Sequence, residues 1–254
     1  MIQITDLVKL KLCPYRFYLE RIKKRRVPTT SEVYTGTVYH KIAEETAKRE
    51  NQIFRELESG YSSRKIFDVL YAEYCRVIRN VILRRKKKLT SLDLDSEILM
   101  ENLRAYYKEI ALDKAVFMKK ALERHDVEVE IESVEYYIEN RELGLVGKID
   151  RVEVHKGMEI PVEIKTVEKK RPTFSEMLQL AGYALLLEWQ RDTTISEGII
   201  EYPLKRIRVD IPDKLKDYVM LLKDYAQEIL AGEIPDKVRT DRCDRCHFYD
   251  ECWR

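Results

Sequence analysis

Four of the five cysteines lie at the two ends of this 254-residue chain. Cys13 is near the start, and Cys243, Cys246 and Cys252 share one run, CDRCHFYDEC, close to the last residue. Two cysteines spaced C-x2-C can bind one metal centre without strain. Three clustered cysteines leave a four-coordinate centre one ligand short, and Cys13 could supply it. The pattern constrains the fold strongly, because it predicts that the two ends of the chain meet.

The residues leave the kind of centre open. Four thiolates fit zinc or an iron–sulfur cluster, and His247 could replace Cys13 in a local zinc site. Disulfides are the other possibility, but an intracellular chain disfavours them. Cys75 stands alone in a helical stretch and is predicted to be a small buried apolar residue. A bound centre would have a structural role, since its loss should loosen both ends of the chain.

The composition and length favour a globular protein with a packed core. An apolar fraction of 44% supports a packed core, and the length suits one large domain or a core with a helical insertion. No run of eighteen apolar residues is present, so we expect no membrane span. The first residues lack the apolar region and cleavage site of a secretion signal, which predicts a cytoplasmic location.

The net charge is only +2, but the basic side chains are clustered. Such clusters can contact a phosphate backbone, or they can be solvated last turns of helices, where Lys and Arg are favoured. The three basic blocks are 21–26, 84–88 and 169–171.

A second informative pattern lies in two predicted β-strands. Their sequences are GLVGKID (144–150) and PVEIKT (161–166). In the longer run MEIPVEIKTV (158–167) that contains the second stretch, Ile160, Val162 and Ile164 point to one face at a period of two. Glu163 and Lys165 therefore point together to the other face. These two side chains are predicted to act at the same place.

In the first stretch, the alternation puts Asp150 on the same face as Val146, Val152 and Val154. An acid between apolar neighbours is costly unless something compensates its charge. Two such acids on adjacent strands, with a lysine after the second, predict a divalent cation site of the kind that cuts phosphodiester bonds. The alternative is the solvated face of an amphipathic sheet.

Hydrophobic periodicity and end signals predict the order of the elements. Helices are predicted at 4–24, with Thr5 as N-cap, and at 37–50, 62–89, 95–123, 174–191 and 213–231, with a loop ending near Gly36. Strands are predicted at 128–139, 144–155, 158–167, 195–202 and 206–210. This order predicts an α/β core with a central mixed β-sheet flanked by helices.

With its strand acids, the lysine after them and its terminal cysteines, the chain resembles the RecB-like branch of the PD-(D/E)XK nucleases. Within that branch it resembles the CRISPR-associated exonucleases that carry an iron–sulfur cluster. The resemblance covers nearly the whole chain, and its motifs occur in the family's order. They are GTVYH (36–40), GKID (147–150), EIK (163–165), QLAGY (179–183) and the four terminal cysteines. The resemblance implies a restriction-endonuclease-like core with a helical insertion.

The resemblance also implies roles for the matching residues. The ligands of Mg²⁺ or Mn²⁺ would be His40, Asp150, Glu163 and Ile164, the last through its backbone carbonyl. Lys165 would be catalytic, by positioning or helping to deprotonate the attacking water and by offsetting charge in the transition state. Gln179 and Tyr183 would orient the DNA strand or that water.

Without the other motifs, some of these residues have simpler interpretations. His40 could be an ordinary helix histidine, and Tyr183 could be a core residue beside an apolar stripe. Glu44 could support His40 from one turn away, or it could form an i,i+4 pair with Lys48.

For the four cysteines, Cys13, Cys243, Cys246 and Cys252, the resemblance implies an iron–sulfur cluster, with [4Fe–4S] favoured over [2Fe–2S]. It further implies a DNA exonuclease that acts on single-stranded ends, from 5′ to 3′, and trims DNA fragments before they enter a CRISPR array. A CRISPR integrase complex would be the partner, and an oligomer is possible. A RecB-type repair or recombination nuclease, a non-catalytic iron–sulfur protein that binds DNA and a zinc-stabilised scaffold are the alternatives.

We expect a single nuclease domain over 1–254. Its parts are N-terminal helices with the first cysteine and the motif histidine (1–54), a helical insertion or lid (55–123), the nuclease core (124–212) and a C-terminal helix with the cluster-binding tail (213–254).

Overall fold

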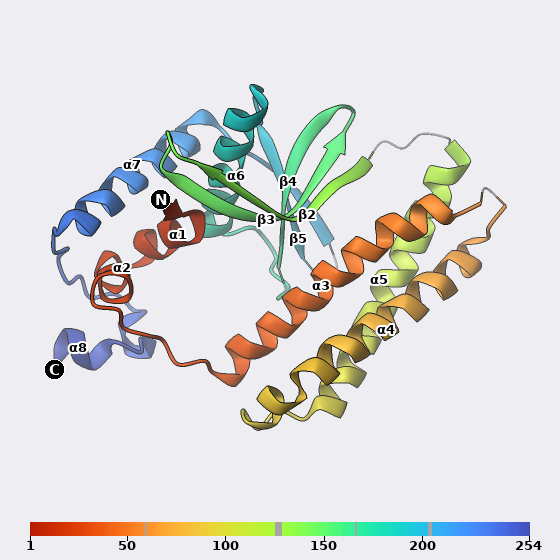
Figure 1. The fold of residues 1–254 in the computed structure, drawn as a ribbon, viewed down its shortest axis with the longest axis horizontal. Helices are drawn as coiled ribbons and strands as arrows, with labels where there is room; N and C mark the ends of the chain where they lie inside the picture. The colour runs from red at the N-terminus through yellow and green to blue at the C-terminus, as the bar shows by residue number, and fades with distance from the viewer. Residues whose placement is uncertain (59, 125–128, 166, 203–204) are drawn as a thin grey trace.

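The structure is a computed structural model that describes residues 1–58, 60–124, 129–165, 167–202 and 205–254 (Figure 1). The predicted strands included residues 128 and 166, which lie outside these ranges. The helices are α1 (Ile4–Leu12), α2 (Pro14–Arg21), α3 (Ser31–Glu56), α4 (Ser63–Thr90), α5 (Ser96–Arg124), α6 (Phe174–Arg191), α7 (Asp213–Ala231), the 3₁₀ turn η1 (Cys243–Arg245) and α8 (Tyr249–Trp253). The strands are β1 (Ile2–Gln3), β2 (Val129–Asn140), β3 (Leu145–His155), β4 (Met158–Ile164), β5 (Glu197–Tyr202) and β6 (Lys205–Asp210).

The strands form one mixed sheet in the order β1-β3-β4-β5-β6, with β2 also paired to β3. β1 and β3 are parallel, as are β4 and β5, and the remaining pairs are antiparallel. In Figure 1 the sheet lies between α6 and α7 on one side and α3, α4 and α5 on the other. This architecture confirms the predicted α/β fold with a mixed central sheet flanked by helices.

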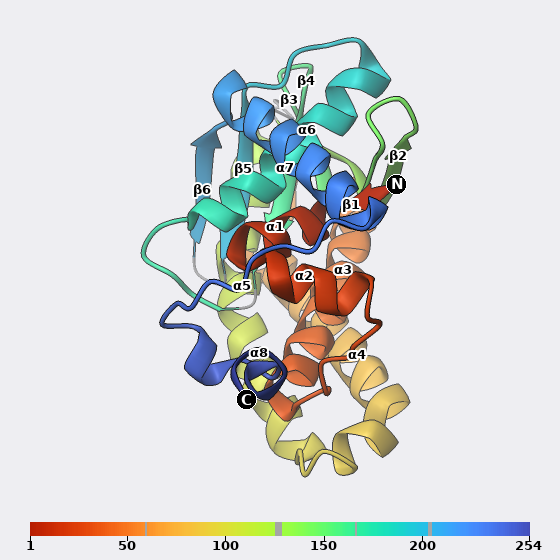
Figure 2. The same cartoon turned by 90° about the vertical axis from the view of Figure 1, so that its left-hand side faces the viewer.

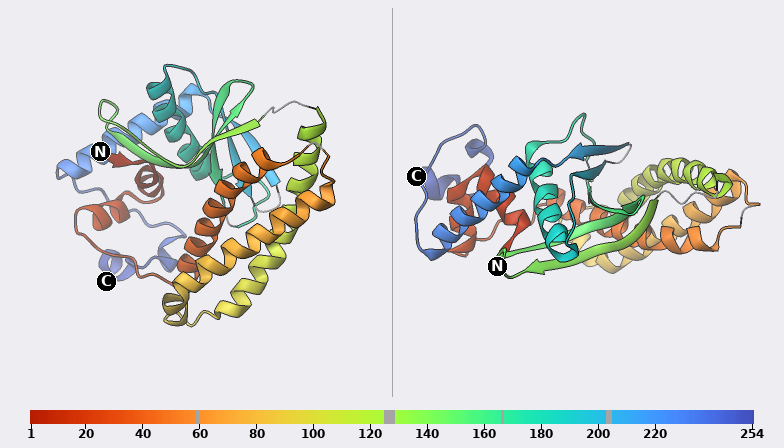
Figure 3. Two further views of the ribbon diagram at one scale, coloured as in Figure 1. Left: turned by 45° about the vertical axis from the view of Figure 1, so that its right-hand side comes forward. Right: turned by 90° about the horizontal axis from the view of Figure 1, so that it is seen from above.

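Two large apolar cores pack separately. One joins the sheet to α1, α2, α6 and α7, and includes Leu7, Ile149 and Leu186. The other lies inside the helical layer of α3, α4 and α5, and includes Ile42 and Tyr74. Figure 3 shows this helical layer beside the sheet from two further directions. The layer is therefore a packing unit with an interior of its own.

The single helix predicted over 4–24 is wrong, because two helices occupy this stretch. α1 ends at Leu12, Cys13 is extended, and α2 starts at Pro14. Proline has no N–H for an α-helical bond and favours the first helical position, so it ends one helix and begins the next. The Cys13 Sγ accepts the N–H of Arg16 at 3.4 Å and caps α2. Thr5 is not the N-cap of α1, because Gln3 is.

α3 begins six residues earlier than the prediction of 37–50 and continues past its end. The Thr30 hydroxyl accepts the N–H of Val33 at 3.3 Å, which supplies a side-chain cap that the sequence interpretation missed. Gly36 therefore lies inside a helix and does not end a loop. By contrast, α6 has the predicted bounds, because the Thr173 and Glu176 side chains form a capping box at its start.

α1 crosses α6 at a glycine. A Cβ on Gly182 would lie 2.6 Å from the Ile4 Cδ1 atom and 2.8 Å from its Cγ2. Ile4 is fully buried and β-branched, so it has little freedom to move aside. The glycine of the QLAGY motif thus allows the first helix to approach α6 closely, one residue before Tyr183.

Figure 2 shows the chain ends on the same side of the molecule, with α8 below α1 and α2. An ion pair joins the two regions, with the Arg25 Nε atom 3.1 Å from the Glu251 Oε2 atom. Among the described residues, no helix is both long and apolar enough to cross a membrane.

Candidate active site

Two carboxylates lie side by side on β3 and β4. The antiparallel register places Arg151 opposite Val162, which makes Asp150 and Glu163 neighbours. The backbone N–H of Ile164 donates to the Asp150 Oδ2 atom at 2.8 Å and fixes that side chain. Glu163 is buried. The two acids that the strand pattern singled out therefore share one site.

A chain of hydrogen bonds continues from Glu163 onto α6. The Lys165 Nζ atom donates to the Glu163 Oε1 atom at 2.7 Å and to the Gln179 Oε1 atom at 3.4 Å. The Gln179 Nε2 atom donates to the Tyr183 Oη atom at 2.8 Å. Both α6 side chains are buried, so this chain is anchored in the core. The structure thus brings together Glu163 of β4, Lys165 directly after that strand, and Gln179 and Tyr183 of α6.

The electrostatics of the acid pair suit a cation. Burial, and then the nearby charge of Glu163, raise the pKa of Asp150 well above its ordinary value. The Glu163 Oε2 atom is buried and makes no hydrogen bond. A buried carboxylate oxygen without a partner is costly, and a hard divalent ion is a partner that would satisfy it. The donor set at this position fits Mg²⁺ or Mn²⁺.

His40 comes from the helical layer, on α3. Burial lowers the pKa of its imidazole, the charge of Glu163 acts in the opposite direction, and Lys165 and Lys148 lower it further. His40 therefore lies within electrostatic range of the strand residues. A lowered pKa keeps the ring neutral, which is the form that binds metals.

The structure shows one of the two predicted roles of Glu44. Its carboxylate accepts from Lys48 and Lys41, each at 2.5 Å, so it forms the i,i+4 pair with Lys48. Within the described ranges, no three His, Cys, Asp or Glu side chains already have the arrangement of a complete metal site.

The four terminal cysteines line one pocket, which the apolar side chains of Leu19, Phe248 and Trp253 also border. They are Cys13, Cys243, Cys246 and Cys252, and all four are free thiols. His247 is exposed and is not among the residues that line the pocket. The arrangement favours Cys13 over His247 as the partner of the C-terminal cysteines.

The surroundings of two of these thiols shift their pKa values in opposite directions. The backbone N–H of Thr240 donates to the Cys243 Sγ atom at 3.4 Å and is the main cause of a lowered Cys243 pKa. Burial raises the pKa of Cys252, and the neighbouring Cys246, Cys13 and Cys243 raise it further. Thiols whose charges affect one another in this way lie near one another, which agrees with the pocket that they share.

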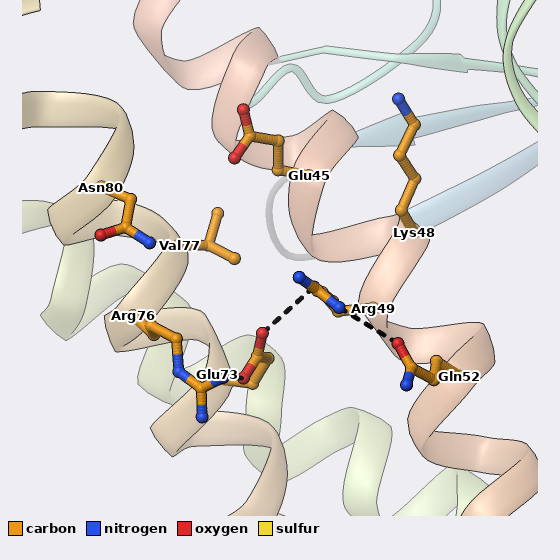
Figure 4. Close-up of a pocket in the computed structure, with 8 residues that line it drawn as sticks. All are labelled: Glu45, Lys48, Arg49, Gln52, Glu73, Arg76, Val77 and Asn80. Atoms are coloured by element: carbon orange, nitrogen blue, oxygen red, sulfur yellow. Dashed lines mark hydrogen bonds and ion pairs between the residues drawn. The ribbon is translucent and has the colours of Figure 1, made fainter. Parts of the chain in front are cut away.

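A second cavity, of about 390 Å³, lies between α3 and α4 and contains none of these residues. Figure 4 shows Arg49 of α3 turned toward Glu73 of α4, with Arg76 beside Glu73 on the same helix. Each arginine pairs with that carboxylate, at 3.2 and 3.0 Å. Both arginines of this cavity are therefore paired, and neither Asp150 nor Glu163 is among the residues that line it.

Sequence reasoning missed a buried ion-pair network behind the acid pair. Arg151 is 2% exposed and pairs with Glu153 and Glu201. The backbone N–H of Lys165 donates to the Glu201 carbonyl oxygen at 2.8 Å. The available signal was weak, since Arg and Glu on a strand are ordinarily read as solvent-facing residues.

The raised pKa of Asp150 predicts a measurable change in stability. Since folding favours the protonated acid, its contribution is present below the ordinary pKa of aspartate and is lost as the pH rises through the folded value. We expect Asp150→Asn to stabilise the metal-free protein at pH 7.5 by about 1 kcal/mol or more, or roughly 2–4 °C in Tm. Thermal unfolding followed by circular dichroism measures this.

The gain should shrink at pH 4, where the wild-type acid is protonated in the folded state. Mn²⁺ should raise the Tm of the wild type and leave that of Asp150→Asn nearly unchanged. Asp236→Asn, at an exposed position, is the matched control. A lower Tm for Asp150→Asn without metal would contradict the account of this site.

The chain is similar in sequence to known nucleases. The family model of the PD-(D/E)XK nuclease superfamily matches residues 4–252. Two curated proteins of Rhodospirillum rubrum are similar over 125 residues, a CRISPR-associated exonuclease Cas4/endonuclease Cas1 fusion at 29% identity and a CRISPR-associated exonuclease Cas4 at 28%. Each match covers 45% of this chain, but only 21% of the fusion and 37% of the exonuclease. The match therefore spans well under half the length of these relatives.

Proposed function

The chain belongs to the PD-(D/E)XK nuclease superfamily, and we propose that it is a metal-dependent exonuclease acting on the ends of single-stranded DNA. The observation that carries the proposal is the unpartnered, buried Glu163 oxygen beside Asp150, within reach of Lys165. A bound divalent cation would satisfy this oxygen, because carboxylate oxygens are the ligands that such hard ions prefer. The arrangement is the one expected of a site that binds a cation and reacts there.

The residues that would hold Mg²⁺ or Mn²⁺ are His40, Asp150, Glu163 and Ile164 through its carbonyl. When bound, the ion would polarise the scissile phosphate and lower the pKa of an attacking water. Lys165 is held by Glu163 and Gln179, so its Nζ atom has a fixed position. From there it donates to the water or to a phosphate oxygen, and it offsets the negative charge that develops in the transition state.

Gln179 and Tyr183 orient this lysine from α6. Because the Tyr183 hydroxyl accepts from Gln179 and both are buried, the Gln179 carbonyl is directed at Lys165 and stays there. Burial, and then the charge of Glu163, raise the pKa of the Tyr183 hydroxyl well above its ordinary value. The hydroxyl therefore remains protonated at neutral pH and serves as a neutral hydrogen-bonding group.

The biological role is proposed from the relatives. Both are described as CRISPR-associated exonucleases, and one is fused to an endonuclease Cas1. We infer that this chain trims DNA fragments from 5′ to 3′ in the cytoplasm before a CRISPR integrase complex inserts them. The four terminal cysteines hold a structural iron–sulfur cluster in this proposal, with [4Fe–4S] preferred over [2Fe–2S].

Cleavage of matched linear and circular DNA tests the activity. The protein is purified anaerobically and incubated with Mn²⁺ and single-stranded DNA labelled at the 5′ end, labelled at the 3′ end, or closed into a circle. We expect shortening of the linear strands, early release of the 5′ label and an intact circle. Equally fast cutting of the circle would show an endonuclease, and no cutting of any substrate would refute the proposal.

A further inference from the structure

The three basic blocks of the sequence have different surroundings in the structure. Residues 84–88 lie in the last turns of α4, where Lys and Arg are favoured, and Arg84 pairs with a glutamate of α3 at 2.7 Å. In 21–26, the Arg21 and Arg25 side chains pair with acids at 2.9 and 3.1 Å. A helix end or an internal ion pair therefore explains both of these blocks.

The third block, 169–171, lies in the loop between β4 and α6. Thr173 is the N-cap of α6, so the block precedes a helix and does not end one. Lys169 pairs with a buried glutamate of α6 at 2.7 Å. Lys170 and Arg171 are exposed, and within the described part of the chain neither has an ion-pair partner. These two adjacent cations are free to bind an anion from outside the chain.

Further lysines lie on both sides of this loop. On one side, the Lys205 Nζ atom of β6 donates to the Lys170 carbonyl oxygen at 3.2 Å. On the other, the Lys11 Nζ atom of α1 lies over the Phe174 ring, 5.6 Å from its centroid. Lys11, Lys170, Arg171 and Lys205 therefore form a basic strip, which runs from β6 across the loop to α1.

The basic strip includes an exposed aromatic ring. Phe174 is the first residue of α6 and is 44% exposed. Its ring packs edge-on against Tyr218 of α7 at a centroid distance of 5.8 Å, which holds it in place. Cations beside an aromatic ring are the combination that binds single-stranded nucleic acid, because the cations follow the phosphates and the bases stack on the ring.

The basic strip lies close to the candidate active site. Lys170 follows Lys165 by five residues in the sequence. Phe174 precedes Gln179 by five residues on α6, which is about 7.5 Å along the helix, and Gln179 accepts from the Lys165 Nζ atom. In Figure 2 the loop projects from the left of the molecule before it enters α6. A strand bound on this loop would therefore be near the acid pair.

We propose that the basic strip binds single-stranded DNA next to the scissile phosphate, with Lys170 and Arg171 on its phosphates and Phe174 under one of its bases. The inference deepens the proposed function and rests on it. A base can stack on Phe174 only when it is not already stacked inside a duplex, so this surface selects single strands. No residue of the basic strip takes part in the chemical step.

Charge and stacking have different signatures in salt, which allows a test. Replacing both Lys170 and Arg171 by alanine removes two phosphate contacts, so the plot of log affinity against log salt concentration should become shallower by about 1.4. Phe174→Leu removes the ring and keeps an apolar side chain. It should weaken binding about tenfold at every salt concentration and leave the slope unchanged.

The measurement is fluorescence anisotropy of a labelled single strand with the full chain, in EDTA so that nothing is cut, over a series of NaCl concentrations. Replacement of both Lys87 and Lys88 by alanine is the matched control, because these exposed lysines lie in the last turn of α4. It removes the same charge and should bind as the wild type does. With Mn²⁺ and saturating DNA, every variant should keep the kcat of the wild type, while the KM rises only in the variants of the basic strip and of Phe174.

An unchanged affinity and salt slope after removal of Lys170 and Arg171 would overturn the inference, as would an equal loss in the α4 control. If Phe174→Leu does not fold, the loop variant decides alone, because both of its side chains are exposed. A wild type that binds single strands at the basic strip and cuts none of them would instead refute the proposed function. The two failures are therefore distinguishable.

Discussion

Lys165→Met is expected to lower the rate of metal-dependent DNA cleavage by about 10²–10⁴-fold. The lysine donates to both Glu163 and Gln179, and no other cation is bonded to either side chain among the described residues. Methionine keeps much of the length of the side chain and removes its charge and donors. The affinity for Mn²⁺ should be equal or higher, since a cation that competes for Glu163 is gone.

Single-turnover cleavage of end-labelled single strands at saturating Mn²⁺ measures the chemical step. Lys169→Met is the matched control, because that lysine also bonds a glutamate at 2.7 Å but its partner is Glu176, in the capping box of α6. Its cleavage rate should stay within a few-fold of the wild type. Loss of Mn²⁺ binding in Lys165→Met would contradict a catalytic role and would indicate a structural one.

Cys246→Ala is expected to remove the bound centre and to lower the Tm by about 10–20 °C. A link between Cys13 and the C-terminal cysteines closes a loop of more than 200 residues, as their numbering shows. In the chain-entropy model, closing a loop of that size contributes about 5 kcal/mol, and each kcal/mol corresponds to roughly 2–4 °C in a protein of this length. Calorimetry of anaerobically purified protein measures the shift.

Metal analysis of the same samples identifies the centre. Iron and sulfide in the wild type, absent from Cys246→Ala, would agree with a cluster, and zinc in their place would favour the zinc site that the cysteine spacing also allows. Cys75→Ala is the control, since Cys75 lies on α4 outside the cysteine pocket and should keep the metal. A wild type that contains neither metal and unfolds at the same temperature as Cys246→Ala would contradict the assignment.

The parts of the fold that depend on local pattern were predictable. α6 and α7 have the predicted bounds, because a capping box starts the first and Gly232, with a φ of 119°, ends the second. The start of α3 was missed, because a glycine at position 36 was read as the end of a loop. A helical glycine costs only about 1 kcal/mol, which tertiary packing readily overrides.

Some residues of the candidate site were predictable from the sequence and others were not. Asp150, Glu163 and Lys165 could be found from the strand pattern, because a charged residue among apolar neighbours needs a reason. Arg151 and Glu201 could not, since their pairing depends on which strands become neighbours, and β4 and β5 are adjacent only through a crossover. The sequence also carries no sign that Glu50 of α3 and Lys114 of α5 would pair across the helical layer.

Because α3 is long, a small tilt about one of its turns displaces a distant turn by a large amount. Its 26 residues span about 39 Å, and roughly 15 Å separate the turn that carries His40 from the turn held at Glu50. A tilt of only about 4° around the anchored end would displace the imidazole by about 1 Å, and errors of that size can reduce enzymatic rates about a hundredfold. Substitutions in the outer turns of this helix can therefore silence the nuclease from a distance, while the acid pair itself stays intact.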